Sequence, residues 1–160
     1  MTPFEIQRVF DAPRERAWNA WTEAEQLKHW WGPKGFTCTR CTVDLRPGGL
    51  MQYCLRSPDG QEMWGRFVYR EIVKPQKLVF VVAFSDEKGG ITRHPMSPDW
   101  PQQILSTVEF EAQGGKTKIT VRWIPVEATA LERKTFEDGR DSMKQGWTGT
   151  FEQLKAYLSL

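Results

Sequence analysis

The side chains most often used for nucleophilic or metal chemistry are few in this chain and lie far apart. The only two histidines are His29 and His94. A zinc site needs three or four ligands from histidine, cysteine or carboxylate side chains. The sequence contains no H-E-x-x-H or G-x-S-x-G motif, and its paired glycines fall at predicted turns, outside any phosphate-binding loop. We therefore expect no metal, no cofactor and no catalytic residue of these kinds.

Cys38 and Cys41 form a C-x-x-C pair, a spacing found in redox and metal sites. The surrounding stretch, 36–43, is rich in β-branched residues and is typical of a strand. Residues three apart on a regular strand point to opposite faces of the sheet. We therefore expect the two cysteines to be packing residues that share neither a metal nor a disulfide. The total of three cysteines also disfavours a disulfide framework.

Glu71 is the one candidate for acid–base chemistry. Alternation along its predicted strand puts it on the same face as Phe67 and Tyr69. A carboxylate facing an apolar cavity would have its pKa raised by desolvation and could act as an acid or a base. The alternative is a position at the cavity rim, paired with an arginine such as Arg8 or Arg46.

The aromatic content of the chain indicates a second kind of site. There are 8 Trp, 9 Phe and 3 Tyr residues, which is more ring area than packing alone needs. Large rings fill a core, but they also line cavities for apolar ligands. The residues predicted to line such a pocket, together with Glu71, are Trp31, Phe36, Met51, Tyr53, Phe67, Tyr69, Phe80, Trp123, Met143, Trp147 and Phe151.

Composition excludes several other classes of protein. At 160 residues the chain is about one domain long, which we place at 1–160. Its net charge of +2 comes from mixed signs without a basic run, so we expect no nucleic-acid partner. No apolar stretch approaches the roughly 20 residues of a membrane span. The N-terminus lacks the features of a signal peptide, so the expected compartment is the cytoplasm.

Seven strands and two short helices are expected to position these side chains. The predicted strands cover 4–10, 36–45, 50–56, 62–73, 77–84, 103–112 and 116–126. Asp11-Ala12-Pro13 is suited to start a first helix, and Thr22 with Glu25 resembles a capping box for a second. Short connections between successive strands favour an antiparallel order.

A long amphipathic helix is predicted at the C-terminus, where Thr129 and Glu132 form a capping-box pattern. Its apolar face consists of Phe136, Met143, Trp147, Phe151, Leu154 and Leu158. Gly139, Gly146 and Gly149 each lower helix propensity by about 1 kcal/mol relative to alanine. They indicate either a break in the helix, or close approach to the sheet and room for a ligand beside Trp147.

The connection 85–102 is long and polar and contains three prolines. Long loops in a compact domain are often functional lids or are simply mobile. We interpret this loop as a candidate flap over the pocket entrance.

Six segments in this order carry a family resemblance. They are 8–18, Trp21-Thr22, Trp30-Trp31-Gly32-Pro33, Asp44-Leu45-Arg46-Pro47-Gly48-Gly49, 71–80 and Gly146-Trp147-Thr148-Gly149-Thr150 with Leu154. Together they resemble the helix-grip superfamily, also called SRPBCC, START-like or birch-allergen-like. Within it, the chain is similar to the homologues of the activator of heat-shock-protein-90 ATPase.

This resemblance implies an α+β fold in which a curved antiparallel sheet of about seven strands grips the long C-terminal helix. It also implies a cavity between sheet and helix that receives lipids, polyketides or other apolar molecules. Binding of a small hydrophobic or amphipathic ligand is therefore the leading expectation. An enzyme of the polyketide cyclase or hydrolase type and a co-chaperone-like interaction protein stay open as alternatives.

The resemblance bears on partners as well. The co-chaperones that gave the family its name carry a separate N-terminal domain that engages the chaperone. This chain begins at the helix-grip strand, so we do not expect a chaperone partner. A homodimer stays open.

Overall fold

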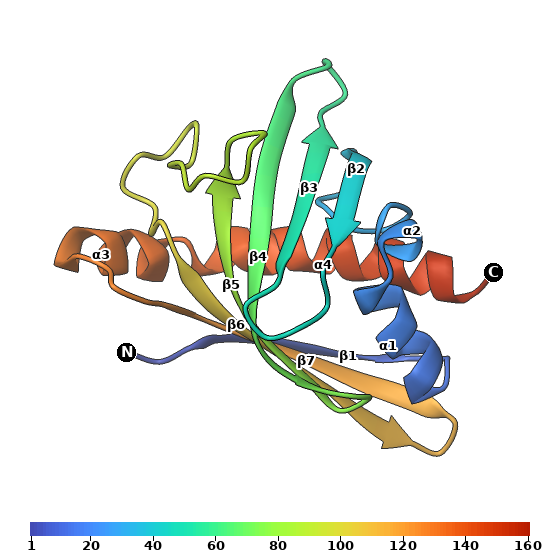
Figure 1. The fold of residues 1–160 in the computed structure, drawn as a ribbon. Coiled ribbons are helices and arrows are strands. Elements are labelled where there is room, and N and C mark those ends of the chain that lie inside the picture. The colour runs from blue at the N-terminus through green and yellow to red at the C-terminus, as the bar shows by residue number, and fades with distance from the viewer.

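In the computed structural model, which describes residues 1–160, seven antiparallel strands form one curved sheet (Figure 1). The strands are β1 Phe4–Phe10, β2 Thr37–Val43, β3 Leu50–Arg56, β4 Glu62–Val73, β5 Lys77–Ser85, β6 Ile104–Gln113 and β7 Lys116–Pro125. Their order in the sheet is β1-β7-β6-β5-β4-β3-β2, so six consecutive strands form a meander and β1 pairs with the last of them. The predicted strands are confirmed, with small shifts at some ends.

Four helices complete the fold. Two short ones, α1 Arg14–Thr22 and α2 Ala24–Leu27, connect β1 to β2. The C-terminal segment forms α3 Ala130–Asp138 and the long helix α4 Arg140–Leu158, which crosses one face of the sheet (Figure 1). The predicted α+β helix-grip architecture is thus confirmed. None of the helices combines the length and apolarity that a bilayer-spanning helix requires.

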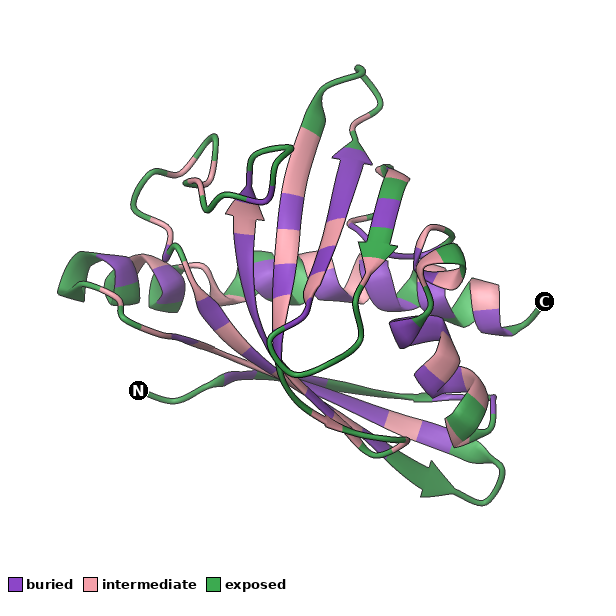
Figure 2. Ribbon diagram, in the orientation of Figure 1, coloured by how far each residue is buried: buried purple, intermediate pink, exposed green.

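The core lies between the sheet and the helices. One cluster of 32 buried hydrophobic residues contains side chains from all seven strands and from the helices, so the gripped helix and the sheet share one interior. Figure 2 shows buried residues alternating with less buried ones along the strands. Trp30 lies deep in this core, where its Nε1 donates a hydrogen bond to the Ala20 carbonyl at 2.9 Å.

The two predicted capping boxes have different outcomes. The box of Thr129 and Glu132 is confirmed at the start of α3, where both of its hydrogen bonds are present. The box of Thr22 and Glu25 is wrong. Thr22 is the buried last residue of α1, and its hydroxyl donates to the Trp18 carbonyl one turn back at 2.8 Å. Since threonine can bond to its own helix in this way, it is not free to cap the next one.

A β-bulge in the edge strand β2 overturns the predicted placement of the C-x-x-C pair on opposite faces of the sheet. The pairing register between β2 and β3 shifts between Cys38 and Arg40. Cys38 lies opposite Leu55, and Cys41 lies opposite Tyr53. A bulge adds one residue to one strand. Two residues that are three apart, with the bulge between them, therefore point to the same face of the sheet. Both cysteines are therefore buried on the inner face, in contrast to the opposite faces expected from a regular strand.

The three glycines of the C-terminal segment have three different structural roles. Gly139 separates α3 from α4, so the expected break is found there. At Gly149 an added Cβ would lie 3.2 Å from the Cβ of Lys34, which indicates a close approach of chain to helix. At Gly146 an added Cβ would meet nothing within 4 Å.

These environments predict opposite responses to the same substitution. Gly146→Ala should raise the free energy of unfolding by about 1 kcal/mol, because alanine favours the helix and the space is free. Gly149→Ala should gain less stability than Gly146→Ala, or should lose stability, because its new methyl group crowds Lys34. Urea denaturation of both variants checks this. An equal gain at both positions would contradict the packing described here.

Candidate functional site

A pocket of about 200 Å³ lies between the sheet and α4. Its wall combines the segment after α2, the inner face of four strands and the middle of α4. The lining residues are Trp31, Gly32, Pro33, Tyr53, Leu55, Met63, Phe84, Trp123, Met143, Gly146, Trp147 and Thr150. None of them carries a charge, so the pocket offers mainly aromatic and aliphatic surface.

Trp147 is the centre of the aromatic wall. Its ring centroid lies 5.7 Å from that of Trp31 and 5.6 Å from that of Trp123, both in edge-on contact. On another side Trp147 stacks against Trp21 at 6.1 Å. Edge-on and offset ring pairs are the favoured arrangements of aromatic side chains. The four tryptophans thus hold one another in place, and the helix supplies the central one.

The polar groups of the pocket wall are few. Thr150 already donates to the Gly32 and Gly146 carbonyls at 2.9 and 3.1 Å. Trp31 Nε1 is buried without a hydrogen-bond partner, although it lies near the Tyr53 hydroxyl. Burial raises the pKa of Tyr53, so its phenol stays neutral. An unpaired buried donor costs free energy.

Gly65 sets the position of Tyr53. The two residues are paired across β3 and β4. An added Cβ at position 65 would lie 2.2 Å from the Tyr53 Oη, so the tyrosine side chain lies directly over the glycine. The absent side chain leaves the space that the ring occupies.

The predicted pocket residues divide into three groups. Those in the pocket wall are Trp31, Tyr53, Trp123, Met143 and Trp147. Those packed in the core outside this wall are Met51, Phe67, Tyr69, Phe80 and Phe151. Phe36 is partly buried and lines a separate, smaller hollow on the surface. The strand residues of the first two groups face inward as alternation predicted. The second group belongs to the part of the interior that side chains fill, as the stacked pair Phe67 and Phe80 at 4.0 Å illustrates.

Glu71 lies elsewhere, and the prediction that it shares a face with Phe67 and Tyr69 is wrong. A bulge shifts the pairing of β4 with β5 between Tyr69 and Glu71. Glu71 is consequently exposed and pairs with Lys77 at 2.9 Å, not with an arginine. The carboxylate therefore does not reach the pocket.

The sequence interpretation missed several wall residues: Gly32, Pro33, Leu55, Met63, Phe84, Gly146 and Thr150. Leu55 and Phe84 continue the alternation of their strands and could have been included. Gly146 had a signal too, because a glycine within a helix needs a structural reason.

The histidines lie outside the pocket wall. His29 stacks on Tyr157 at 5.5 Å, and His94 lies 4.7 Å from the Phe84 ring. No group of three or more His, Cys, Asp or Glu side chains is arranged to hold a metal ion.

The family described as "Activator of Hsp90 ATPase homolog 1-like protein" matches the chain over residues 11–159. The chain belongs to this family. Among proteins with curated descriptions, none matches the chain.

Solved structures share the fold of this family member over nearly its whole length. A protein from Arthrobacter aurescens is 29% identical, with a TM-score of 0.81, and the match covers 99% of this chain and 86% of that one. Protein Ms6760 from Mycobacterium smegmatis is 26% identical, with a TM-score of 0.77 over 95% and 87% of the two chains. The AHSA1 protein from Silicibacter pomeroyi is 16% identical and shows the fold alone, with a TM-score of 0.75 over 98% and 97%.

In this family member, the connection between β5 and β6 closes one end of the interior. A second, smaller pocket of about 70 Å³ is lined partly by Trp100, Pro101 and Gln102 of this loop. It shares Tyr53, Phe84 and Trp123 with the main pocket. The loop thus lies where a flap would lie, and its movement stays a prediction.

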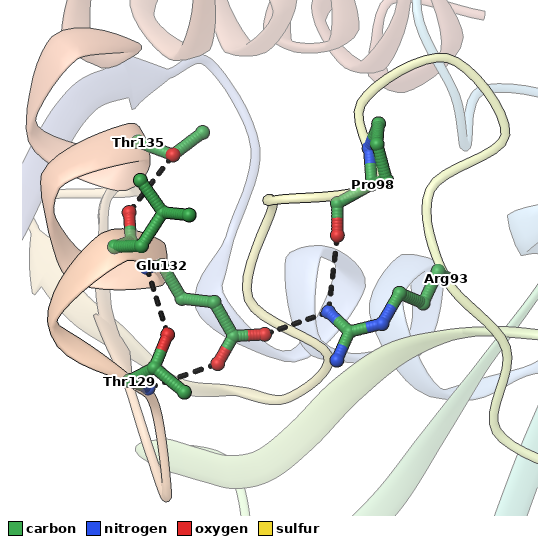
Figure 3. A network of polar contacts seen from close by, with 6 residues as sticks. Arg93, Pro98, Thr129, Glu132 and Thr135 are labelled. Carbon is green, nitrogen blue, oxygen red and sulfur yellow. Dashed lines mark hydrogen bonds and ion pairs between the residues drawn. The ribbon is translucent and has the colours of Figure 1, made fainter.

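An ionic contact fastens this loop to α3 (Figure 3). Arg93 Nη1 donates to Glu132 Oε2 at 2.7 Å and to the Pro98 carbonyl at 3.1 Å. The other oxygen of Glu132 accepts from the Thr129 backbone N–H at 2.9 Å. One buried carboxylate therefore serves both the cap of α3 and the anchorage of the loop.

Gly65→Ala tests the placement of Tyr53. An alanine in a strand usually packs better than glycine, but here it should cost about 1–3 kcal/mol of stability, because its methyl group overlaps the tyrosine ring. The cost should shrink in a Tyr53→Ala background. A double-mutant cycle by urea denaturation measures this coupling. Additive effects would mean that Tyr53 does not depend on the glycine.

Glu132→Gln tests the shared carboxylate. Hydrogen bonds from the Thr129 backbone N–H and from Arg93 lower the pKa of Glu132 below its ordinary value. The ionised carboxylate therefore adds to the free energy of unfolding. This stabilisation is fully present above the unfolded-state pKa of about 4.3 and is lost as the pH falls through the lower folded-state pKa. Glutamine can keep the capping bond but loses the charge that faces Arg93, so we expect the variant to be less stable than the wild type at pH 7 by about 1 kcal/mol.

The difference between Glu132→Gln and wild type should shrink in acid, measured by urea denaturation across this pH range. Glu111→Gln removes an exposed ion pair with Lys118 and is the matched control, for which we expect a small effect. A difference at Glu132 that is the same at all pH values would contradict the proposed role of its charge.

Proposed function

We propose that the chain binds a small, uncharged and mostly apolar molecule in the pocket between the sheet and α4. The observation that carries this proposal is an uncharged aromatic pocket, one of whose wall residues, Trp31, has a buried donor without a partner. The ligand would place a hydroxyl or carbonyl oxygen near Trp31 Nε1 and the Tyr53 hydroxyl. Its remaining surface would lie against Trp147, Trp123 and Met143.

The proposed ligand is uncharged because the pocket wall has no charged side chain. No Asp, Glu, Lys, Arg or His lines the pocket. Moving an ion out of water is costly unless a counter-charge or several hydrogen bonds replace the lost hydration. A charged ligand would therefore be strongly disfavoured relative to a neutral one of the same shape.

The same wall favours binding over a reaction. A cyclase or hydrolase needs a group that accepts or donates a proton at the working pH. Tyr53 has the only titratable side chain in the wall, and burial raises its pKa further from neutrality. It is suited to donate a hydrogen bond to a ligand and unsuited to act as a base.

A matched set of bicyclic probes tests this proposal by isothermal titration calorimetry. The set is 2-naphthol, naphthalene and 2-naphthoate, which are neutral with a hydroxyl, neutral without one, and anionic. We expect 2-naphthol to bind most tightly, naphthalene up to about tenfold more weakly because one hydrogen bond is lost, and 2-naphthoate most weakly. Tight binding of the anion alone would contradict the proposal.

Two variants connect the binding to the pocket. Gly146→Leu puts a side chain into free space and removes a helix glycine, so it should abolish binding while the protein stays folded. Trp31→Phe keeps a ring but removes the indole N–H, so it should cancel the advantage of 2-naphthol over naphthalene. Unchanged binding in Gly146→Leu would place the probes elsewhere.

A further inference from the structure

Two free thiols lie side by side on the inner face of the edge strand β2. The bulge described above brings Cys38 and Cys41 to this face, and both are buried. Their partners on β3, Leu55 and Tyr53, are two residues apart, so the two cysteines occupy neighbouring positions on this face. The Cys38 thiol donates to the Arg40 carbonyl at 3.4 Å. On a regular strand, a spacing of three would put the two thiols on opposite faces. The extra residue of the bulge puts them on the same face, so they form a dithiol.

A small molecule can approach this pair from the surface. Cys38 lines a hollow of about 150 Å³, whose wall also contains Lys28, His29 and Gln153. This hollow is distinct from the pocket between sheet and helix. Cys41 is buried and does not line this hollow. Cys38 is therefore placed to react with an incoming reagent, and Cys41 is placed to react with the oxidised Cys38.

The pKa shifts of the two cysteines assign the same roles to them. The neighbouring Cys41 thiol lowers the pKa of Cys38, and the Lys28 ammonium group contributes in the same direction. The pKa of Cys41 is raised, because Cys38 is adjacent and because the site is buried. Since the thiolate is the nucleophile, Cys38 is the more reactive sulfur and Cys41 keeps its proton.

We propose that Cys38 and Cys41 form a reversible redox site, in which a small hydroperoxide oxidises Cys38 and Cys41 completes a disulfide. Cys38 attacks the peroxide, its S–O bond forms as the O–O bond breaks, and the departing oxygen leaves as water or alcohol. Cys41 then attacks the sulfenic sulfur. The S–S bond forms, the S–O bond breaks, and hydroxide leaves as water with the Cys41 proton. The dithiol loses two electrons and the peroxide gains them.

The position of the pair favours reversibility. β2 pairs with β3 on one side and has no strand on the other (Figure 1). An edge strand with a bulge adjusts more easily than a strand held on both sides. A thiol reductant can return the disulfide to the dithiol by exchange.

Cys54 is a built-in control. It lies between Tyr53 and Leu55 on β3, so it points to the other face of the sheet. Its thiol donates to Glu62 Oε2 at 3.5 Å, and burial raises its pKa. It is a cysteine of the same chain without a second thiol beside it on its face.

The experiment treats the reduced full-length protein with hydrogen peroxide, blocks the remaining thiols with iodoacetamide and maps the peptides by mass spectrometry. We expect Cys38 and Cys41 to lose alkylation together, with a loss of two hydrogen masses that dithiothreitol restores. Cys54 should stay alkylated. In urea this selectivity should disappear, because it depends on the fold.

Single variants separate the two roles. Cys41→Ser should leave Cys38 as a sulfenic acid that dimedone traps, and Cys38→Ser should slow oxidation of Cys41 to the rate of Cys54. Cys54→Ser should behave as the wild type. Oxidation of Cys54 at the same rate as Cys38, or disulfides between chains only, would overturn the proposal. The peptide map of the wild type decides the question even where a variant folds poorly.

Discussion

The contact on which the fold and the pocket both depend is that of Trp147 with the inner face of the sheet. The helix α4 has to bury its apolar side against a surface that curves away from it. The Trp147 side chain spans the distance between α4 and the sheet, and its ring contacts those of Trp21, Trp31 and Trp123. Beyond these rings, at Gly146, the helix offers no side chain, and space remains. The pocket is thus the part of the interior that a straight helix and a curved sheet do not fill.

Much of this fold could be predicted from the sequence because it rests on local signals. Alternation along the strands, turn residues such as those at 57–60, and the capping box of Thr129 and Glu132 act within a few residues of one another. The capping box of Thr22 failed, because that hydroxyl bonds within its own helix. The pattern of residue types is the same in both cases, and only the surrounding packing distinguishes them.

The site was less predictable, because it depends on which inward-facing rings are left uncovered. Alternation identified Phe67 and Phe80 as inward-facing as correctly as Tyr53. It could not tell that the first two stack on each other while the third lies over Gly65 beside the pocket. That difference comes from the placement of α4 and of the segment after α2, which only the assembled structure defines.

Two bulges decide which chemistry the interior contains. In β4 the bulge moves the carboxylate of Glu71 out to solvent, where it pairs with Lys77. In β2 the bulge moves a second thiol in, beside Cys38. Both changes reverse what a period of two predicts, since one inserted residue exchanges the faces of everything after it. The result is a neutral aromatic pocket and, at the sheet edge, two thiols on one face, and for this reason ligand binding and thiol oxidation are proposed at separate places.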